Sequence, residues 1–170
     1  MKYADLHVHT FYSDSTFSPE EVISCAVDKG LSAIAICDHD SIDGIEPCLK
    51  IGLEAGVEVI PGIEMTAEKV DAEIHLLGYF IDWQSSDFRE KLKEVQKSRI
   101  DRIYTMTDKL REKGIDVDPQ AVFKLAGRGT VGRLHMAQAM LNTGKVRTFP
   151  HIPYRLPSHP ASLSHQNCAK

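Results

Sequence analysis

Residues 1–80 alternate between short apolar strands and amphipathic helices, and this order constrains the fold more than any other feature of the chain. The run Ala33-Ile34-Ala35-Ile36-Cys37 is apolar throughout, which is typical of a strand buried on both faces of a parallel sheet. We expect strands at residues 3–9, 33–37, 57–60 and 73–80. Because the links between elements are short, the sequence predicts an α/β fold with a parallel sheet or barrel. Functional groups in such folds gather at the carboxyl ends of the strands.

The helices between these strands have recognisable start and stop signals. Ser18 stands three residues before Glu21, which is the pattern of a capping box at the start of a helix. This helix should end at Gly30, since glycine is the usual residue after a helix terminus. A second helix is expected over residues 45–55. We therefore expect residues 1–85 to form the amino-terminal part of the fold.

The pattern changes at residue 86, where apolar residues begin to recur at helical spacing. The residues of this stripe are Leu92, Val95, Ile100, Ile103, Met106 and Leu110. They predict one long helix that ends near residue 113, with shorter helices over 118–125 and 131–141. We expect residues 86–145 to be a helical insertion. Residues 146–170 are rich in proline and lack apolar periodicity, so we expect an irregular tail there.

Potential metal ligands stand at or near the end of each expected strand. His7 and His9 are two residues apart, and side chains alternate along a strand, so both imidazoles should point to the same face. The full candidate set is His7, His9, Asp14, His39, Glu64 and His75. Since the carboxyl ends of parallel strands meet at one edge of a sheet, we expect these side chains to converge on one cleft. Asp38 and Asp40 either orient the imidazoles or belong to a turn and helix cap.

The types of ligand restrict the metal. Mixed histidine and carboxylate sets suit zinc, manganese or iron, whereas calcium and magnesium sites consist almost entirely of oxygen. The candidates are too many for one tetrahedral ion, so we expect two to three divalent ions, with Glu64 as a natural bridge. Neighbouring divalent ions can clamp a phosphoryl group and activate a water molecule.

Four segments resemble the successive motifs of the PHP (polymerase and histidinol phosphatase) superfamily. They are Asp5-Leu6-His7-Val8-His9-Thr10, Asp38-His39-Asp40-Ser41, Pro61-Gly62-Ile63-Glu64 and Ile74-His75-Leu76-Leu77-Gly78-Tyr79. The resemblance is strongest to the stand-alone metal-dependent phosphoesterases, whose helical insertion has a Gly-Arg-x-His element similar to Gly132-Arg133-Leu134-His135. It implies a distorted (β/α)7-type barrel that is incomplete here, with the first strands and the helical insertion present.

The resemblance also implies roles for individual residues. The implied ligand sets are His7, His9 and Glu64 for one metal ion, Glu64 and His75 for a second, and Asp14 and His39 for a third. The implied catalytic residues are Asp14, His39, Glu64 and Arg133. Arg133 and His135 would bind the substrate, because a guanidinium fork matches phosphate oxygens. The implied reaction is hydrolysis of a phosphate ester by a metal-bound hydroxide. The substrate would be a nucleotide 3',5'-bisphosphate, another phosphorylated small molecule, or the 5' end of a short RNA or DNA.

The similarity ends near Lys145, whereas the family pattern continues with later barrel strands and further metal ligands. An open barrel exposes a strand edge, so a homodimer through that edge is expected. The alternative is a catalytically impaired remnant of the family that binds metal weakly. A polymerase-associated accessory domain is a further alternative, although the chain has no polymerase sequence.

Charge and hydropathy restrict the classes of binding partner that we expect. The formal net charge of −4 gives no reason to expect general affinity for nucleic acid or membranes. No apolar run approaches the ~18 residues that a membrane span requires, and the chain opens on a histidine-bearing strand rather than a leader. We therefore expect a cytoplasmic protein without a membrane partner.

Overall fold

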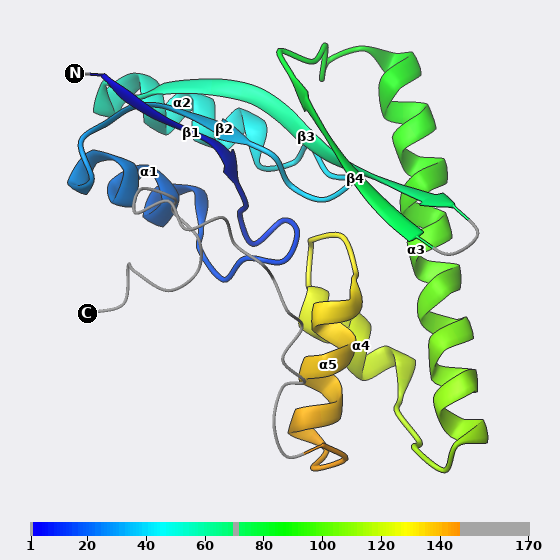
Figure 1. Ribbon diagram of the computed structural model, residues 1–170. Coiled ribbons are helices and arrows are strands. Elements are labelled where there is room, and N and C mark those ends of the chain that lie inside the picture. Colours follow the sequence, from blue (N-terminus) through cyan, green and yellow to red (C-terminus); the bar gives the residue numbers. More distant parts are fainter. Residues whose placement is uncertain (1, 70–71, 147–170) are drawn as a thin grey trace.

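The computed structural model describes residues 2–69 and 72–146. The elements are β1 (Tyr3–Val8), α1 (Pro19–Asp28), β2 (Leu31–Ile36), α2 (Ile45–Ala55), β3 (Glu58–Lys69), β4 (Ala72–Tyr79), α3 (Ser86–Glu112), α4 (Pro119–Ala126) and α5 (Arg133–Asn142). The four strands form one curled sheet in the order β1-β2-β3-β4 (Figure 1). This half-barrel with its helices confirms the predicted incomplete α/β barrel. From residue 147 on, the expected tail lies outside the described residues.

The first three strands are parallel, but the fourth is not. β1 pairs with β2 and β2 with β3 in parallel, whereas β3 and β4 form an antiparallel hairpin, from Gly62 opposite Tyr79 to Lys69 opposite Ala72. The expectation of a fourth parallel strand was therefore wrong. β3 continues well past Ile60, so the chain turns directly back, and a direct return can only pair antiparallel.

The predicted helix signals act as expected. The Ser18 Oγ accepts a hydrogen bond from the backbone N–H of Glu21 at 3.2 Å, and the Glu21 carboxylate accepts one from the Ser18 N–H at 2.8 Å. This reciprocal pair satisfies two amide donors at the start of α1. At the other end, Gly30 adopts a left-handed φ of 65°. These bonds confirm the predicted capping box and fix where the helix begins.

Two large hydrophobic clusters, and a small third one of Ala35, Cys37 and Ile60, hold the described residues together. The first lies between the sheet and helices α1 and α2 and includes Ile23, Ala26, Ile34, Ile36, Ile45, Ile63 and Leu92. The second joins α3 to α4 and α5 and includes Ile103, Val117, Val122, Val131 and Met136. Helix α3 contributes to both, so it links the sheet to the helical segment (Figure 1). Among the described residues, no helix has the length and apolar character needed to cross a membrane.

The loop between α4 and α5 returns to the loop after β1, where the ligand candidates lie (Figure 1). The backbone N–H of Thr130 donates to the carbonyl of Tyr12 at 2.9 Å, and the Thr130 hydroxyl donates to the carbonyl of His39 at 2.5 Å. Gly129 permits this approach, because a Cβ atom there would lie 2.7 Å from the carbonyl oxygen of Phe11. The helical segment is thus anchored beside the ends of β1 and β2.

Candidate metal centre

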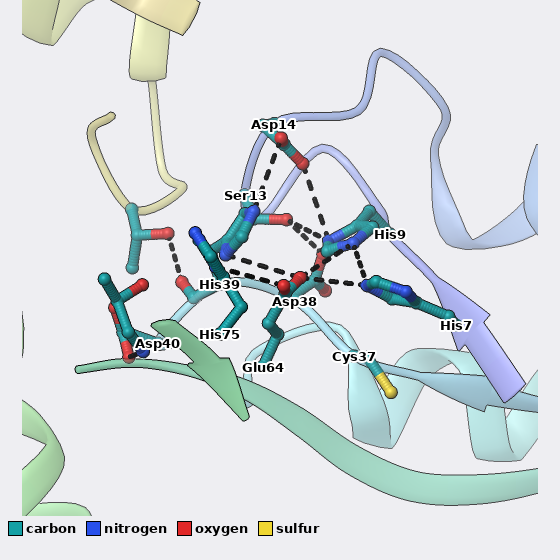
Figure 2. Close-up of polar contacts among 12 residues, drawn as sticks. His7, His9, Ser13, Asp14, Cys37, Asp38, His39, Asp40, Glu64 and His75 are labelled. Carbon is teal, nitrogen blue, oxygen red and sulfur yellow. Dashed lines mark hydrogen bonds and ion pairs between the residues drawn. The ribbon is translucent and has the colours of Figure 1, made fainter. Parts of the chain in front are cut away.

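All six predicted ligands meet in one cluster at the strand ends (Figure 2). His7 lies near the end of β1, and His39 follows β2. A bridge outside the regular strands joins His39 to Glu64 of β3. In it, the N–H of Asp40 donates to the carbonyl of Glu64 at 3.0 Å, and the N–H of Glu64 donates to the carbonyl of Asp38 at 3.2 Å. These backbone bonds place the loop after β2 directly against β3.

The Glu64 carboxylate is the centre of the cluster. Its Oε2 lies 2.9 Å from His7 Nε2, 3.2 Å from His9 Nε2 and 3.5 Å from His39 Nδ1. Its Oε1 lies 3.0 Å from His75 Nδ1. The antiparallel hairpin explains the last contact, since β4 runs back along β3 and carries His75 toward Glu64. One carboxylate is therefore shared by four imidazoles.

Asp14 completes the cluster on the side away from His75. Its Oδ1 lies 3.5 Å from His9 Nδ1, and its Oδ2 lies 3.6 Å from His39 Nε2. Three ligand groups result, and in each the potential donor atoms lie within 4.8 Å of one another. The groups are His7, His9 and Glu64; His9, Asp14 and His39; and His39, Glu64 and His75.

The cluster fits divalent metal ions better than it fits a network of hydrogen bonds. The ring nitrogens His7 Nε2 and His9 Nε2 face each other at 3.0 Å beside a single carboxylate oxygen. Within the described part of the chain, the buried Nδ1 of His39 has no hydrogen-bond partner. A buried polar atom without such a bond is costly, and a neutral imidazole nitrogen is a common metal ligand. The donor set is therefore suited to divalent metal ions.

The electrostatics keep Glu64 ready to bind metal. Burial acts to raise the pKa of Glu64, but hydrogen bonds to His7 and His9 and the nearby charge of His39 outweigh it and hold the pKa well below its usual range. Glu64 is therefore a carboxylate at neutral pH. Burial lowers the pKa of His9, but the hydrogen bond to Glu64 and the charge of Asp14 outweigh burial, so its net pKa is raised.

Asp38 supports the cluster without belonging to it. Its carboxylate accepts hydrogen bonds from the N–H and hydroxyl of Thr10 at 2.7 and 2.6 Å, and from the Ser13 hydroxyl at 2.6 Å. Burial raises the pKa of Asp38, and these hydrogen bonds act against that rise. The Ser13 oxygen also lies 3.3 Å from His9 Nδ1. Asp38 therefore shapes the turn after β1 and acts on the His9 imidazole through Ser13.

The two predicted substrate-binding residues lie at the start of α5. Arg133 is exposed in the first turn, and His135 is half-buried, with its Nδ1 accepting a hydrogen bond from the N–H of Gly132 at 3.1 Å. Burial lowers the pKa of His135. Neither residue belongs to the three ligand groups found among the described residues. The loop before them contacts the cluster, because the Thr130 hydroxyl donates a hydrogen bond to the carbonyl of His39.

Several supporting residues were not predicted from the sequence. They are Thr10, Ser13, Arg99 and Thr130. Ser13 could have been suspected from its position between two ligands, His9 and Asp14. Arg99 gives no such signal, because it lies in a long, highly charged helix. Cys37 lies beside the cluster in Figure 2, but burial and the charges of Glu64 and Asp38 raise its pKa to about 12, so it is no nucleophile.

Curated proteins that resemble this chain include an exoribonuclease and a nucleoside bisphosphate phosphatase. A 5'-3' exoribonuclease from Haemophilus influenzae is 33% identical over 142 residues, which cover 84% of this chain and 52% of the relative. A 3',5'-nucleoside bisphosphate phosphatase from Chromobacterium violaceum is 26% identical over 165 residues, covering 95% of this chain and 58% of the relative. The chain thus spans about half the length of the curated relatives it matches.

Two solved structures are similar to this chain in fold. An amidohydrolase from Chromobacterium violaceum, determined with bound sulfate and no metal, matches with a TM-score of 0.78 and 25% identity over 96% of this chain and 58% of that chain. A protein from Bifidobacterium adolescentis, assigned as a metal-dependent phosphoesterase, matches with a TM-score of 0.77 and 27% identity over 86% of this chain and 52% of that chain. The family model for the PHP domain matches residues 5–127, most of the chain. The chain therefore belongs to the PHP domain family.

Proposed function

We propose that this chain is a metal-dependent phosphoesterase that hydrolyses a phosphate ester of a nucleotide or of an oligonucleotide 5' end. The observation that carries the proposal is the Glu64 carboxylate, which lies within 3.5 Å of ring nitrogens from four histidines. The names of the relatives support the substrate class, since they include a nucleoside bisphosphate phosphatase and a 5'-3' exoribonuclease. The competing proposal is a remnant of the family that binds metal weakly and releases no phosphate.

The three ligand groups would hold two to three ions of manganese, iron or zinc. Each group offers three imidazole or carboxylate donor atoms that lie within 4.8 Å of one another. When bound, such ions supply an activated water molecule and offset the negative charge of the phosphate. Three residues, Glu64, His9 and His39, each belong to two of the groups. Neighbouring metal sites would therefore share ligands.

The chain's own residues would bind and orient the phosphate. Arg133 is exposed at the start of α5, where its guanidinium can donate two hydrogen bonds to phosphate oxygens. Burial favours the neutral form of the neighbouring His135. Because its Nδ1 accepts the hydrogen bond from the Gly132 N–H, its Nε2 carries the ring proton and can donate a hydrogen bond to a phosphate oxygen. Asp14 and Glu64 contribute negative charge that balances the metal ions rather than the substrate.

The partners are a phosphorylated substrate and a second copy of the chain. Among residues 2–69 and 72–146, β1 is an edge strand of the sheet, and its Tyr3 and Leu6 side chains are 57% and 45% exposed. An exposed edge with apolar side chains is suited to pairing. A dimer with a mass twice that of the chain in light scattering would support this arrangement, and a monomer at all concentrations would contradict it. We also propose that the protein is cytoplasmic.

The deciding experiment measures metal content and phosphate release together. The purified chain is reconstituted with Mn²⁺ and given adenosine 3',5'-bisphosphate. We expect bound manganese and release of inorganic phosphate, with both lost in Glu64→Gln and both retained in Glu54→Gln, which changes an exposed glutamate of α2. Bound metal without phosphate release would support the remnant. If the chain binds no metal and releases no phosphate, the proposed site itself is contradicted.

A further inference from the structure

Helix α3 buries a charged residue on the side that packs against the rest of the chain. Its buried residues are Leu92, Arg99, Ile103 and Thr107. Arg99 is only 8% exposed, while the expected stripe residue beside it, Ile100, is 43% exposed. Arginine is almost never buried unless it is paired, so the position of Arg99 requires specific contacts.

The Arg99 guanidinium donates hydrogen bonds to three separate segments. Its Nε donates to the Asp40 carboxylate at 2.5 Å, its Nη2 donates to the Thr66 hydroxyl at 2.7 Å, and its Nη1 donates to the Val131 carbonyl at 3.3 Å. The three donors lie in one rigid plane, so their acceptors are held in a fixed relation to one another. A more flexible cation with a single head could not reproduce this arrangement.

The first segment carries a metal-ligand candidate. Asp40 directly follows His39, is fully buried, and has a left-handed φ of 46°, which a residue with a side chain adopts only when its surroundings hold it. One carboxylate oxygen of Asp40 bonds to Arg99, and the other accepts a hydrogen bond from the Thr66 N–H at 3.1 Å. The Gln96 side chain donates to the Asp40 carbonyl at 2.9 Å. Helix α3 therefore fixes the backbone that presents His39.

The other two segments lead to the hairpin and to α5. Thr66 is two residues from Glu64 and lies opposite His75 in the antiparallel register. Val131 precedes Gly132, the residue that caps α5, and a Cβ atom on Gly132 would lie 3.4 Å from Arg99 Nη1. The guanidinium thus touches the segments that carry His39, the Glu64–His75 pair and the start of α5.

We propose that Arg99 is a positioning residue that sets the metal ligands and the phosphate-binding end of α5 in one common arrangement. This proposal rests on the proposed function, because it assigns Arg99 to that same site. Arg99 acts through Asp40, Thr66 and Val131. Loss of the fork should loosen the loop that holds His39 and the loop before Arg133 at the same time.

The test compares Arg99→Lys with two further variants. Lysine keeps the charge opposite Asp40 but cannot reach three acceptors at once. Thr66→Val removes one acceptor with little change in shape and serves where Arg99→Lys fails to fold. The matched control is Arg111→Lys, on the same helix, because Arg111 is exposed and pairs with Asp108 and Asp116 on the surface.

Two measurements separate positioning from general stability. In the metal-free protein, amide hydrogen exchange of peptides over residues 38–41 and 129–135 should be faster in Arg99→Lys, while α1 stays as protected as in the unaltered chain. Mn²⁺ should bind about tenfold more weakly, as for other residues that orient metal ligands. Thr66→Val should show a smaller loss, and Arg111→Lys should show none.

The outcomes distinguish this proposal from the proposed function. If the unaltered chain binds no Mn²⁺, the metal site is wrong, and faster exchange confined to the two loops would still support the role of Arg99. If the unaltered chain binds Mn²⁺ and Arg99→Lys changes neither exchange nor affinity, the role of Arg99 is overturned. Equal acceleration of exchange in α1 would also overturn it, since Arg99 would then be merely structural.

Discussion

At the scale of single residues, the six ligand candidates could be predicted from the sequence, because their residue types and their positions near strand ends are both visible there. Histidines and carboxylates recur at strand ends, and the structure brings all of them into one cluster. Their supports were not identifiable in this way. Ser13 and Arg99 belong to common residue types, and their roles depend on contacts with Asp38 and Asp40, which come from distant parts of the chain.

Ser13→Ala should weaken metal binding without unfolding the protein. The change removes the hydroxyl that lies between the Asp38 carboxylate and His9, so the imidazole loses one of the groups that orient it. We expect Mn²⁺ affinity to fall about tenfold and stability to fall by about 1–2 kcal/mol, as measured by metal titration and urea unfolding. Ser15→Ala, in the same loop, should leave the affinity unchanged, and an equal loss in both variants would contradict this role for Ser13.

The Cys37 thiol should resist alkylation in the folded protein. Burial and neighbouring carboxylates raise its pKa to about 12, so at pH 8.5 only roughly one thiol in three thousand is ionised, against about half for an ordinary thiol. The thiolate fraction grows as pH rises, so reactivity should appear only on approach to pH 12 or on unfolding. Iodoacetamide labelling with mass spectrometry in buffer and in urea tests this, and rapid labelling of Cys37 at pH 8.5 in buffer would contradict it.

At the scale of elements, local signals predicted most boundaries. The capping box at Ser18 marks the start of α1, and residues 45–55 form α2 as expected. The error at β4 arose because strand direction depends on the connection and not on the strand's own sequence. β3 runs on to Lys69, which leaves a short return instead of a crossover helix. Likewise, periodicity assigned Ile100 to the buried side of α3, where Arg99 lies instead.

The contact between the α4–α5 loop and the β1 loop depends on Gly129. In Gly129→Ala the new methyl group would meet backbone atoms of Phe11 and Tyr12 at 2.7–2.8 Å, so one loop must move. We expect a loss of about 2–3 kcal/mol in the free energy of unfolding. The control Gly114→Ala meets nothing within 4 Å and has only the strain of its φ of 80°, so its loss should be about 1 kcal/mol. Equal losses in urea unfolding would contradict the close approach.

At the scale of the whole molecule, the metal centre is the place where separate elements join. Ligands come from β1, from the loops after β1 and β2, and from both strands of the β3–β4 hairpin. The first hydrophobic cluster reaches the ligands through Val8 and Ile63, but the ligand side chains themselves belong to neither of the two large clusters. A metal ion would therefore add links that the described apolar packing does not provide.

Chelation should lower the melting temperature. A ligand that binds only the folded state at a hundred times its Kd stabilises it by about 2.7 kcal/mol, which for a chain of this size corresponds to roughly 5–10 °C. We expect EDTA to remove this increment from the Mn²⁺-loaded protein in calorimetry. His9→Ala should melt at the same temperature with or without EDTA, and an unchanged melting temperature in the unaltered chain would contradict the linkage.

The shared carboxylate of Glu64 also sets the order of events when the chain folds. Its contact with His7 spans 57 residues, so the donor atoms meet only after a large loop has closed and three parallel strands have found their register. Pairings between distant residues form late and slowly in folding. Metal binding should accordingly follow the rate-limiting step of folding. The rate at which the refolding chain binds Mn²⁺ would then report how fast the native sheet is completed.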